Sequence, residues 1–266
     1  MVKDDMRDTV VLITGATSGI GKATAEGLAE KGASLVLVGR SDDRLAKLGE
    51  EMERRFRAPT LQLLRADLSS MAEVRRLAST IMATNPRLDV LINNAGTIVG
   101  GRQLTADGFE YTFALDHLSP FLLTNLLLDL LKSSAPSRII TISSVWHETA
   151  SMYFNDLMLE EGYSPSKAYG QAKLANVLFT YELARRLEGS GVTANCAHPG
   201  VVRSRFGNEA SGLVHIGLVA IRPFELSPRQ GAATPIHLAS SPEVEGVTGK
   251  YFVRKRPRKT SPASYD

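Results

Sequence analysis

A chain of 266 residues is long enough to bury a sizeable core and short enough to form one domain. It is 43% hydrophobic and 22% charged with a formal net charge of +3, so its composition is that of a globular protein and gives no global sign of nucleic-acid binding. The single cysteine, Cys196, excludes an intrachain disulfide and lies in an apolar run typical of a buried strand. No stretch reaches the roughly 18 to 20 apolar residues of a membrane span, and residues 1–8 lack the apolar core of a signal peptide. We therefore expect no membrane anchor and a cytoplasmic location.

Short apolar runs alternate with amphipathic segments along the chain. Strands are predicted at residues 9–14, 34–38, 60–64, 88–92, 137–142 and 192–196, with helices at 20–31, 44–57 and 72–84 between them. Near-continuous apolar strands are typical of a parallel sheet covered on both faces, and repeated strand–helix–strand units give a doubly wound α/β fold. We expect one domain over residues 1–266, with an irregular insertion at about 203–228 and a basic C-terminal tail at about 254–266.

A glycine-rich stretch, T-G-A-T-S-G-I-G at residues 14–21, follows the first predicted strand and opens a helix. Glycine permits positive φ and close backbone approach, so a ligand phosphate can reach the free N–H groups at the helix start. The spacing differs from the G-x-G-x-x-G dinucleotide motif, but strand, glycines and helix occur in the required order. The candidate phosphate-binding residues are Gly15, Thr17, Ser18, Gly19, Ile20 and Gly21.

The ends of the next three strands complete a polar rim. An acidic residue after the second strand commonly holds a ribose 2′-hydroxyl, whereas an arginine accommodates a 2′-phosphate. Here Gly39 occupies the acidic position and Arg40 follows, which favours NADP and makes NAD the weaker candidate, although Asp42 and Asp43 could partly neutralise the arginine. Ligands gather at the carboxyl ends of strands in such sheets, so five further residues at these ends are candidates: Asp67, Leu68, Asn94, Ala95 and Gly96.

The stretch Y-S-P-S-K-A-Y-G-Q-A-K at residues 163–173 contains two Tyr-x-x-x-Lys pairs. A lysine one helical turn from a tyrosine lies on the same face and favours its phenolate form, which suits acid–base catalysis at a carbonyl. Pro165 belongs in a first helical turn, so Tyr163 lies at or before the helix start. Tyr169 and Lys173 fall inside the helix, and we interpret this second pair as the catalytic one.

Taken together, these motifs resemble the short-chain dehydrogenase/reductase family, from about Thr9 to Tyr251. The matching stretches are T-G-A-T-S-G-I-G, Asp67, N-N-A-G, I-S-S, Tyr169-Gly-Gln-Ala-Lys173 and His198-Pro199-Gly200, and S-S-V-W-H is most similar to the retinol dehydrogenase-like branch. The resemblance implies a Rossmann fold with a mostly parallel seven-stranded sheet. It also implies Tyr169 as acid/base, Lys173 as its modulator and a cofactor ribose ligand, and Ser144 as the hydroxyl that orients the substrate. The resemblance places further cofactor contacts after the last predicted strand, at Pro199, Gly200, Val202 and Ser204.

One residue departs from the family pattern. In F-A-L-D-H-L, residues 113–118, Asp116 stands where the family carries an asparagine whose backbone carbonyl helps to hold a proton-relay water near the lysine. A carboxylate there could pair with the Lys173 ammonium and weaken its effect on Tyr169. We count Asp116 among the catalytic candidates and expect activity with an altered pH dependence.

The sequence thus predicts an NADP(H)-dependent oxidoreductase that interconverts a carbonyl and an alcohol. Apolar residues of the insertion and the branch resemblance favour a lipophilic small-molecule substrate. The alternative, suggested by Asp116, is a non-catalytic NADP-binding sensor or interaction protein. No His/Cys cluster supports a metal site, and the basic run at residues 254–259 is more typical of a solvated tail than of a nucleic-acid contact. Homodimeric and homotetrameric assemblies are both compatible with this interpretation.

Overall fold

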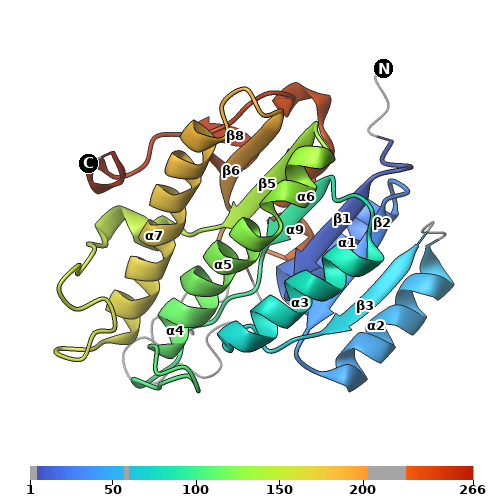
Figure 1. Ribbon diagram of the computed structural model, residues 1–266. Coiled ribbons are helices and arrows are strands. Elements are labelled where there is room, and N and C mark those ends of the chain that lie inside the picture. The colour runs from blue at the N-terminus through green and yellow to red at the C-terminus, as the bar shows by residue number, and fades with distance from the viewer. Residues whose placement is uncertain (1–4, 57–59, 203–225, 266) are drawn as a thin grey trace.

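An eight-stranded sheet forms the centre of the structure, with strand order β3-β2-β1-β4-β5-β6-β7-β8 (Figure 1). The computed structural model describes residues 5–56, 60–202 and 226–265. Neighbouring strands are parallel except for the last pair, β7 and β8. The strands are β1 (Val10–Thr14), β2 (Ser34–Gly39), β3 (Leu61–Arg65), β4 (Val90–Asn93), β5 (Ser137–Ile142), β6 (Val192–His198), β7 (Lys250–Val253) and β8 (Arg256–Arg258).

The predicted fold class is confirmed, and the six predicted strands lie within two residues of β1 to β6 at each end. The sheet has eight strands rather than seven because part of the basic run adds a strand. β8 folds back on β7 as a hairpin, with Val253 opposite Arg256. The segment at residues 254–266 therefore begins with paired backbone, and not with a free tail.

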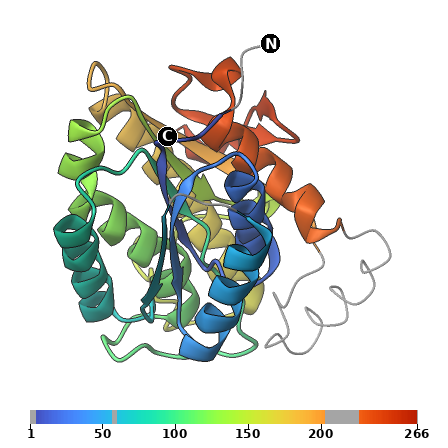
Figure 2. The same ribbon diagram turned by 90° about the vertical axis from the view of Figure 1, so that its right-hand side faces the viewer.

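Helices cover both faces of the sheet. α3 (Met71–Thr84), α5 (Ser119–Leu126) and α7 (Pro165–Arg186) lie on one face, in front of the sheet in Figure 1. α1 (Gly19–Ala29), α2 (Asp42–Arg55) and α9 (Pro228–Ser240) lie on the other, as the edge-on view of Figure 2 shows. The shorter helical segments are α4 (Tyr111–Phe113), the π-helical turn η1 (Ala114–Leu118), α6 (Leu128–Ser133), η2 (Val145–Thr149), η4 (Pro242–Val244) and η5 (Pro262–Ser264). Within the described ranges, no helix is both long and apolar enough to cross a membrane.

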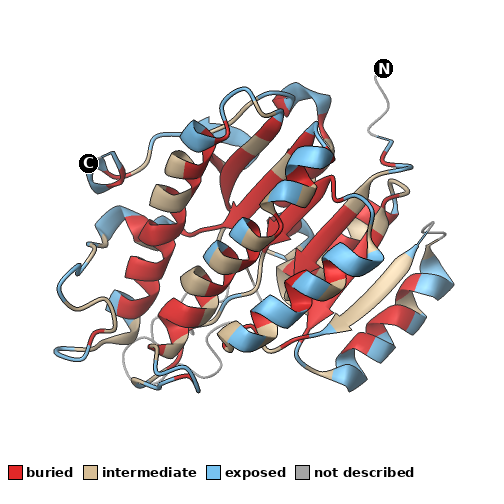
Figure 3. Cartoon of the chain, viewed as in Figure 1, coloured by how far each residue is buried: buried red, intermediate tan, exposed pale blue. Residues whose placement is uncertain are grey.

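The core is divided by the sheet into two layers. Consecutive side chains of a strand point to opposite faces, so Val11 and Ile13 pack with α1 and α9 whereas Leu12 packs against α3 and α5. All three are fully buried, and most residues of the central strands are buried, while the edge strand β3 is only partly covered (Figure 3). Burial on both faces explains why the strands read as continuous apolar runs in the sequence.

The strand order reverses direction at β1. This strand pairs with β2 on one side and with β4 on the other, so the chain winds outward both ways from the β1–β4 boundary. In doubly wound sheets the ligand crevice lies outside the carboxyl ends of the strands at this switch point. Thr14, Gly39, Asn93, Ile142 and His198 end their strands at this edge, and the predicted site residues follow them.

Candidate active site

The glycine-rich loop after β1 has the backbone shape that phosphate binding requires. Gly15 and Gly19 have φ values of +66° and +56°, in the left-handed region that favours glycine. A Cβ atom on Gly21 would lie 2.3 Å from the Gly15 carbonyl oxygen, so this position has no room for a side chain. α1 begins at Gly19, and the side chain of its N-cap residue Ser18 makes no capping hydrogen bond. Among residues 5–56, 60–202 and 226–265, nothing occupies the first N–H groups of α1, so they can bind an anion, and the loop fits the pyrophosphate of a dinucleotide.

Residues after β4 hold this loop in place. The Asn94 side chain donates to the carbonyl oxygens of Thr14 at 2.8 Å and Gly15 at 3.3 Å. The backbone N–H groups of Asn94 and Ala95 both donate to the Thr14 hydroxyl, at 2.9 and 3.0 Å. The predicted pair of loops thus forms one hydrogen-bonded unit across the switch point, with Thr14, which the sequence reasoning missed, at its centre. A threonine that ends a strand before a glycine-rich loop is the signal that could have identified it.

The ends of β2 and β3 form the rim where a cofactor's adenosine end would lie. A Cβ atom on Gly39 would lie 2.6 Å from Cγ2 of Thr17, so a larger residue is excluded there while Thr17 keeps its place. Arg40 is exposed, and its guanidinium donates to the Tyr111 hydroxyl at 3.2 Å. Asp67 lies at the same rim, but its carboxylate accepts from the backbone N–H and hydroxyl of Ser69 and so caps its own turn. Leu68 is buried next to it.

Ser144, Tyr169 and Lys173 come together at the carboxyl end of β5. Ser144 follows this strand and caps η2, and its hydroxyl is hydrogen-bonded to Tyr169, which lowers the pKa of that phenol. Lys173 lies one turn after Tyr169 on α7, with Nζ 5.2 Å from the centre of the tyrosine ring. Burial nevertheless raises the pKa of Tyr169, opposed by the Lys173 charge and reinforced by Asp116. The arrangement places a hydroxyl pair next to a buried cation, as proton transfer to a carbonyl oxygen requires.

The predicted contact between Asp116 and Lys173 is present. Their charged atoms Oδ2 and Nζ lie 2.8 Å apart, and the two side chains are 0% and 4% exposed. Burial alone would lower the pKa of Lys173, but the Asp116 carboxylate raises it, so the ammonium form is maintained. Burial also raises the pKa of Asp116, an effect that Lys173 and a hydrogen bond from the Thr97 backbone N–H partly offset. We therefore describe the couple as a buried ion pair.

Asn176 completes this cluster and was missed in the sequence reasoning. Its amide nitrogen donates to the backbone carbonyl of Asp116 at 2.8 Å, and its oxygen contacts Nδ1 of His117 at 3.0 Å. The carbonyl of Asp116 lies in the π-helical turn η1, where the regular helical hydrogen bonding is interrupted. The spacing of Tyr169, Lys173 and Asn176, four and then three residues apart on α7, places all three on one helix face and could have identified it.

The second tyrosine–lysine pair does not share this geometry. α7 begins at Pro165 after the N-cap Ser164, whose hydroxyl accepts from the Lys167 backbone N–H, so Tyr163 precedes the helix. The Tyr163 hydroxyl faces the Val99 carbonyl at 3.5 Å, and burial raises its pKa to about 12. The Lys167 ammonium instead donates to the Gly162 carbonyl at 3.0 Å.

The segment after β6 closes the site from the other side. Gly200 has a φ of +88°, and Val202 pairs with Leu226 as an isolated bridge. Side chains of Val202 and Ile20 both reach Gly231 on α9, which brings this segment beside the glycine-rich loop. The predicted contact Ser204 and residues 203–225 of the predicted insertion lie outside the described residues.

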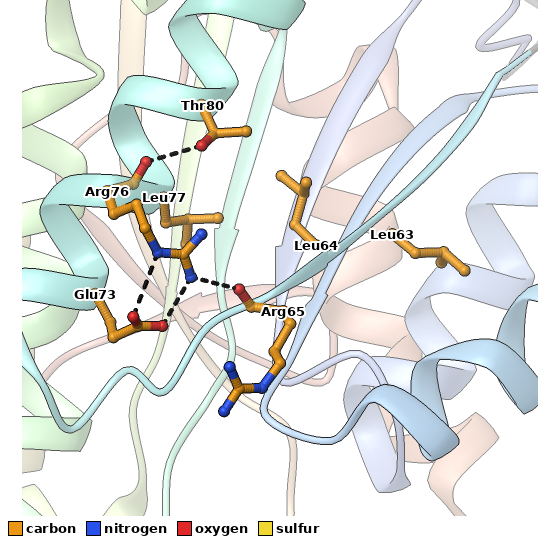
Figure 4. Close-up of a pocket in the computed structure, with 7 residues that line it drawn as sticks. All are labelled: Leu63, Leu64, Arg65, Glu73, Arg76, Leu77 and Thr80. Carbon is orange, nitrogen blue, oxygen red and sulfur yellow. Dashed lines mark hydrogen bonds and ion pairs between the residues drawn. The ribbon is translucent and has the colours of Figure 1, made fainter.

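Of two cavities in the structure, one borders the segments that carry the candidate site and the other lies away from them. A cavity of about 1150 Å³ borders Val145, which follows Ser144, and the segment His198–Val201. A smaller one of about 290 Å³ lies between β3 and α3, away from the site (Figure 4). In the smaller cavity the Arg76 guanidinium is paired with Glu73 at 2.7 Å and donates to the Arg65 carbonyl. The second arginine of this cavity, Arg65, is also paired, with Asp42 at 3.5 Å, so we assign the chemistry to the larger cavity and its surroundings.

Comparison with known proteins agrees with this geometry. The family model described as short chain dehydrogenase matches residues 9–212. The chain belongs to this family. It is 45% identical to human retinol dehydrogenase 14 over 267 residues, covering 93% of this chain and 78% of the relative, and 42% identical to human retinol dehydrogenase 12 over 243 residues, covering 91% and 77%. These relatives place it in the retinol dehydrogenase-like branch.

Solved structures of similar proteins have the same fold. A crystal structure of an uncharacterized protein from Mycobacterium paratuberculosis is 33% identical, with a TM-score of 0.78 and coverage of 98% of this chain and 89% of that one. An NADP active-site complex of RhlG from Pseudomonas aeruginosa is 29% identical, with a TM-score of 0.76 and coverage of 95% and 96%. The family is one of oxidoreductases with nicotinamide cofactors, and the retinol dehydrogenase relatives support interconversion of a carbonyl and an alcohol.

Proposed function

We propose that the protein is an NADP(H)-dependent oxidoreductase that interconverts a carbonyl and an alcohol on a lipophilic small molecule. The observation that carries the proposal is the convergence of Ser144, Tyr169 and Lys173 at the carboxyl end of β5, beside a loop shaped for a dinucleotide. Family membership alone would leave the identity of the acid open, because the chain contains two Tyr-x-x-x-Lys pairs. The position of the second pair inside α7 supports Tyr169.

In the reduction direction, NADPH supplies the hydride and the chain supplies the proton. Negative charge develops on the substrate oxygen as its carbon accepts the hydride. The Ser144 hydroxyl orients that oxygen by a hydrogen bond, and the Tyr169 hydroxyl gives it a proton. The Lys173 ammonium then stabilises the phenolate that Tyr169 becomes, and its pairing with Asp116 sets the strength of this effect.

The preference for NADP rests on the end of β2. An acidic side chain is absent from position 39, and the short distance from Gly39 to Thr17 leaves no room for one. Arg40 follows on the exposed surface, where its guanidinium suits a 2′-phosphate. The NADP complex of the similar RhlG structure supports the same cofactor.

A lipophilic substrate is supported by the larger cavity and by the relatives. Apolar side chains of Val145, Val201, Leu226 and Val253 line that cavity, and Val145 directly follows Ser144 in the chain. The curated relatives are named for retinol, which is itself a lipophilic alcohol.

The test is NADPH-dependent turnover of a panel of aldehydes and ketones of increasing chain length, with NADH in parallel. We expect Tyr169→Phe to lower kcat by at least about a thousandfold, within the range of general acid–base catalysis. Tyr163→Phe is the matched control, since it removes the hydroxyl of the other tyrosine–lysine pair, and should retain activity. Loss of activity in the control alone would reverse the assignment.

The buried ion pair also supports a second candidate, a non-catalytic NADP-binding sensor or interaction protein. Lys173 is paired with Asp116 at 2.8 Å, so part of its charge is withheld from Tyr169. Cofactor binding without turnover across the panel, combined with turnover in Asp116→Asn, would favour this candidate.

A further inference from the structure

The hairpin of β7 and β8 brings a group of cations to the larger cavity. Arg254, Lys255, Arg258 and Lys259 line it together with the apolar side chains of Val145, Val201, Leu226 and Val253. Among the described residues that line the cavity, the one carboxylate is that of Glu148. We propose that this hairpin binds the anionic end of the substrate, so that the substrate class is an oxo compound or alcohol with an apolar body and a terminal carboxylate or phosphate. The proposal rests on the function proposed above.

The four cationic side chains are available for a ligand. All four residues are exposed, and in the part of the chain that the structure describes none of them forms an ion pair. They also do not serve the cofactor rim, which lies at the ends of β2 and β3 on the other side of the switch point. Cations beside an apolar cavity form a surface that matches an amphiphilic anion.

The turn of the hairpin gives an independent reason to assign a role to these side chains. Arg254 and Lys255 have φ values of 49° and 65°, and Val253 lies opposite Arg256, so the loop has two residues. Two-residue hairpin loops with positive φ at both positions favour Asn-Gly, because bulky residues are disfavoured in this conformation. The Lys255 backbone N–H is anchored to the Thr234 hydroxyl on α9 at 3.2 Å. Disfavoured backbone held in place by its surroundings is typical of functional positions.

The cavity also contains one polar atom that a ligand could satisfy. His198 lines the cavity and is 7% exposed, and its Nδ1 has no hydrogen-bond partner within the described ranges. Burial lowers its pKa to about 4, so the ring is neutral near pH 7 and adds no charge. The ring end of the cavity therefore suits a neutral part of the substrate, and the hairpin suits the charged end.

The decisive variant replaces the turn by the sequence that the turn prefers. Arg254→Asn combined with Lys255→Gly removes two charges while relieving the backbone, so we expect a higher Tm and an intact hairpin. Arg256→Gln is the matched control, because Arg256 is an exposed cation of the same hairpin that does not line the cavity. Both variants and the parent are assayed with NADPH on 12-oxododecanoate and on its methyl ester, at 0.05 and 0.5 M salt.

We expect the parent to prefer the carboxylate over the ester in kcat/KM at low salt. Each exposed cation contributes about two- to fivefold, so the Asn-Gly variant should lose about tenfold of that preference while Arg256→Gln keeps it. High salt should reduce the parent's preference. Equal use of both compounds by the parent, or an unchanged preference in the Asn-Gly variant, would overturn the proposal. The charges would then serve to prevent the edge strand from pairing with another chain.

Two further outcomes distinguish an anion site for the substrate from a failure of the proposed activity and from a cofactor or membrane contact. If no compound is turned over, the proposed activity fails, and calorimetric binding of decanoate against 1-decanol in the presence of NADP then decides the anion site. Tighter binding of decanoate that the Asn-Gly variant loses supports the site, and equal binding overturns it. A variant that instead weakens only NADPH binding, or only retention on anionic vesicles, would also overturn it in favour of a cofactor or membrane contact.

Discussion

The substitution Asp116→Asn tests how the buried ion pair controls the catalytic tyrosine. The two side chains have nearly the same shape, and an asparagine oxygen can still accept from the Thr97 backbone N–H, as Asp116 does at 2.7 Å. The hydrogen bond from Asn176 reaches the backbone carbonyl of residue 116 and does not depend on the side chain. The change therefore removes one negative charge, keeps both of these hydrogen bonds, and takes from Lys173 the carboxylate that raises its pKa.

The expected change in the stability of the Tyr169 phenolate follows from its distances to Lys173 and Asp116. At an effective dielectric constant of about 20, the Lys173 charge 5.2 Å from the Tyr169 ring centre contributes about 3 kcal/mol to the phenolate. The Asp116 oxygen lies 2.8 Å from that nitrogen, so it is at most about 8 Å from the ring and opposes this by about 2 kcal/mol. With Lys173 protonated, removing the carboxylate should therefore favour the phenolate by a factor of at least about 30.

The assay is the pH dependence of kcat/KM in both directions. Oxidation uses the phenolate as base, so its rate rises through the pKa of Tyr169, and the midpoint should move to lower pH in Asp116→Asn. Reduction uses the phenol as acid, so its rate should begin to fall at a lower pH than in the parent. The position of the midpoint is the readout, since an altered fold would change the rate without moving it.

Asp89→Asn provides the matched control for this variant. Asp89 is also buried, also pairs with a cation, the Arg87 guanidinium at 2.5 Å, and also accepts from a backbone N–H, that of Val10. It lies just before β4, at the opposite edge of the sheet from the site. We expect this control to lose stability and to keep the parental pH profile. Coincident profiles for the parent and Asp116→Asn would refute the proposed coupling.

Three further changes test the cofactor loop, the cofactor rim and the core. Gly21→Ala should weaken NADPH binding at least about tenfold by fluorescence titration, because its Cβ would lie 2.3 Å from a carbonyl oxygen, and an unchanged Kd would show that the loop is not the phosphate site. Arg40→Gln should raise the KM for NADPH about tenfold and leave that for NADH within about twofold, and an equal effect on both would remove Arg40 from the 2′-phosphate. Leu91→Ala should lower the free energy of unfolding in urea by about 3 kcal/mol, since Leu91 is fully buried in β4; a loss below about 1 kcal/mol would contradict the packing described.

The sheet could be predicted because its strands carry a strong local signal. Val11, Leu12 and Ile13 point to alternate faces of the sheet and are all apolar, which is typical of a parallel strand covered on both faces. The eighth strand carries the opposite signal. Arg256 and Arg258 are exposed, and their pairing with β7 depends on a two-residue turn of Arg and Lys that does not resemble a hairpin sequence.

The candidate site could be predicted as a set of residue types, but not as a network. The spacing of Tyr169 and Lys173 places them on one helix face, and Pro165 excludes Tyr163 from that helix. The role of Asn176 depends on how α7 packs against the π-helical turn that carries Asp116. This is a contact between segments 60 residues apart, so the spacing along α7 can indicate Asn176 but not its partner.

The short distance between Gly39 and Thr17 has a consequence for redesign of cofactor use. Converting such an enzyme to NAD ordinarily calls for an aspartate at the position of Gly39, to bind the ribose hydroxyls. Here the new Cβ atom would lie 2.6 Å from a methyl group of Thr17, so the single exchange would force the Thr17 side chain in the phosphate loop to shift. Replacing Thr17 by serine removes that methyl group and keeps the hydroxyl. Space for an acidic side chain at the end of β2 is therefore a property of two positions, and the two have to be exchanged together.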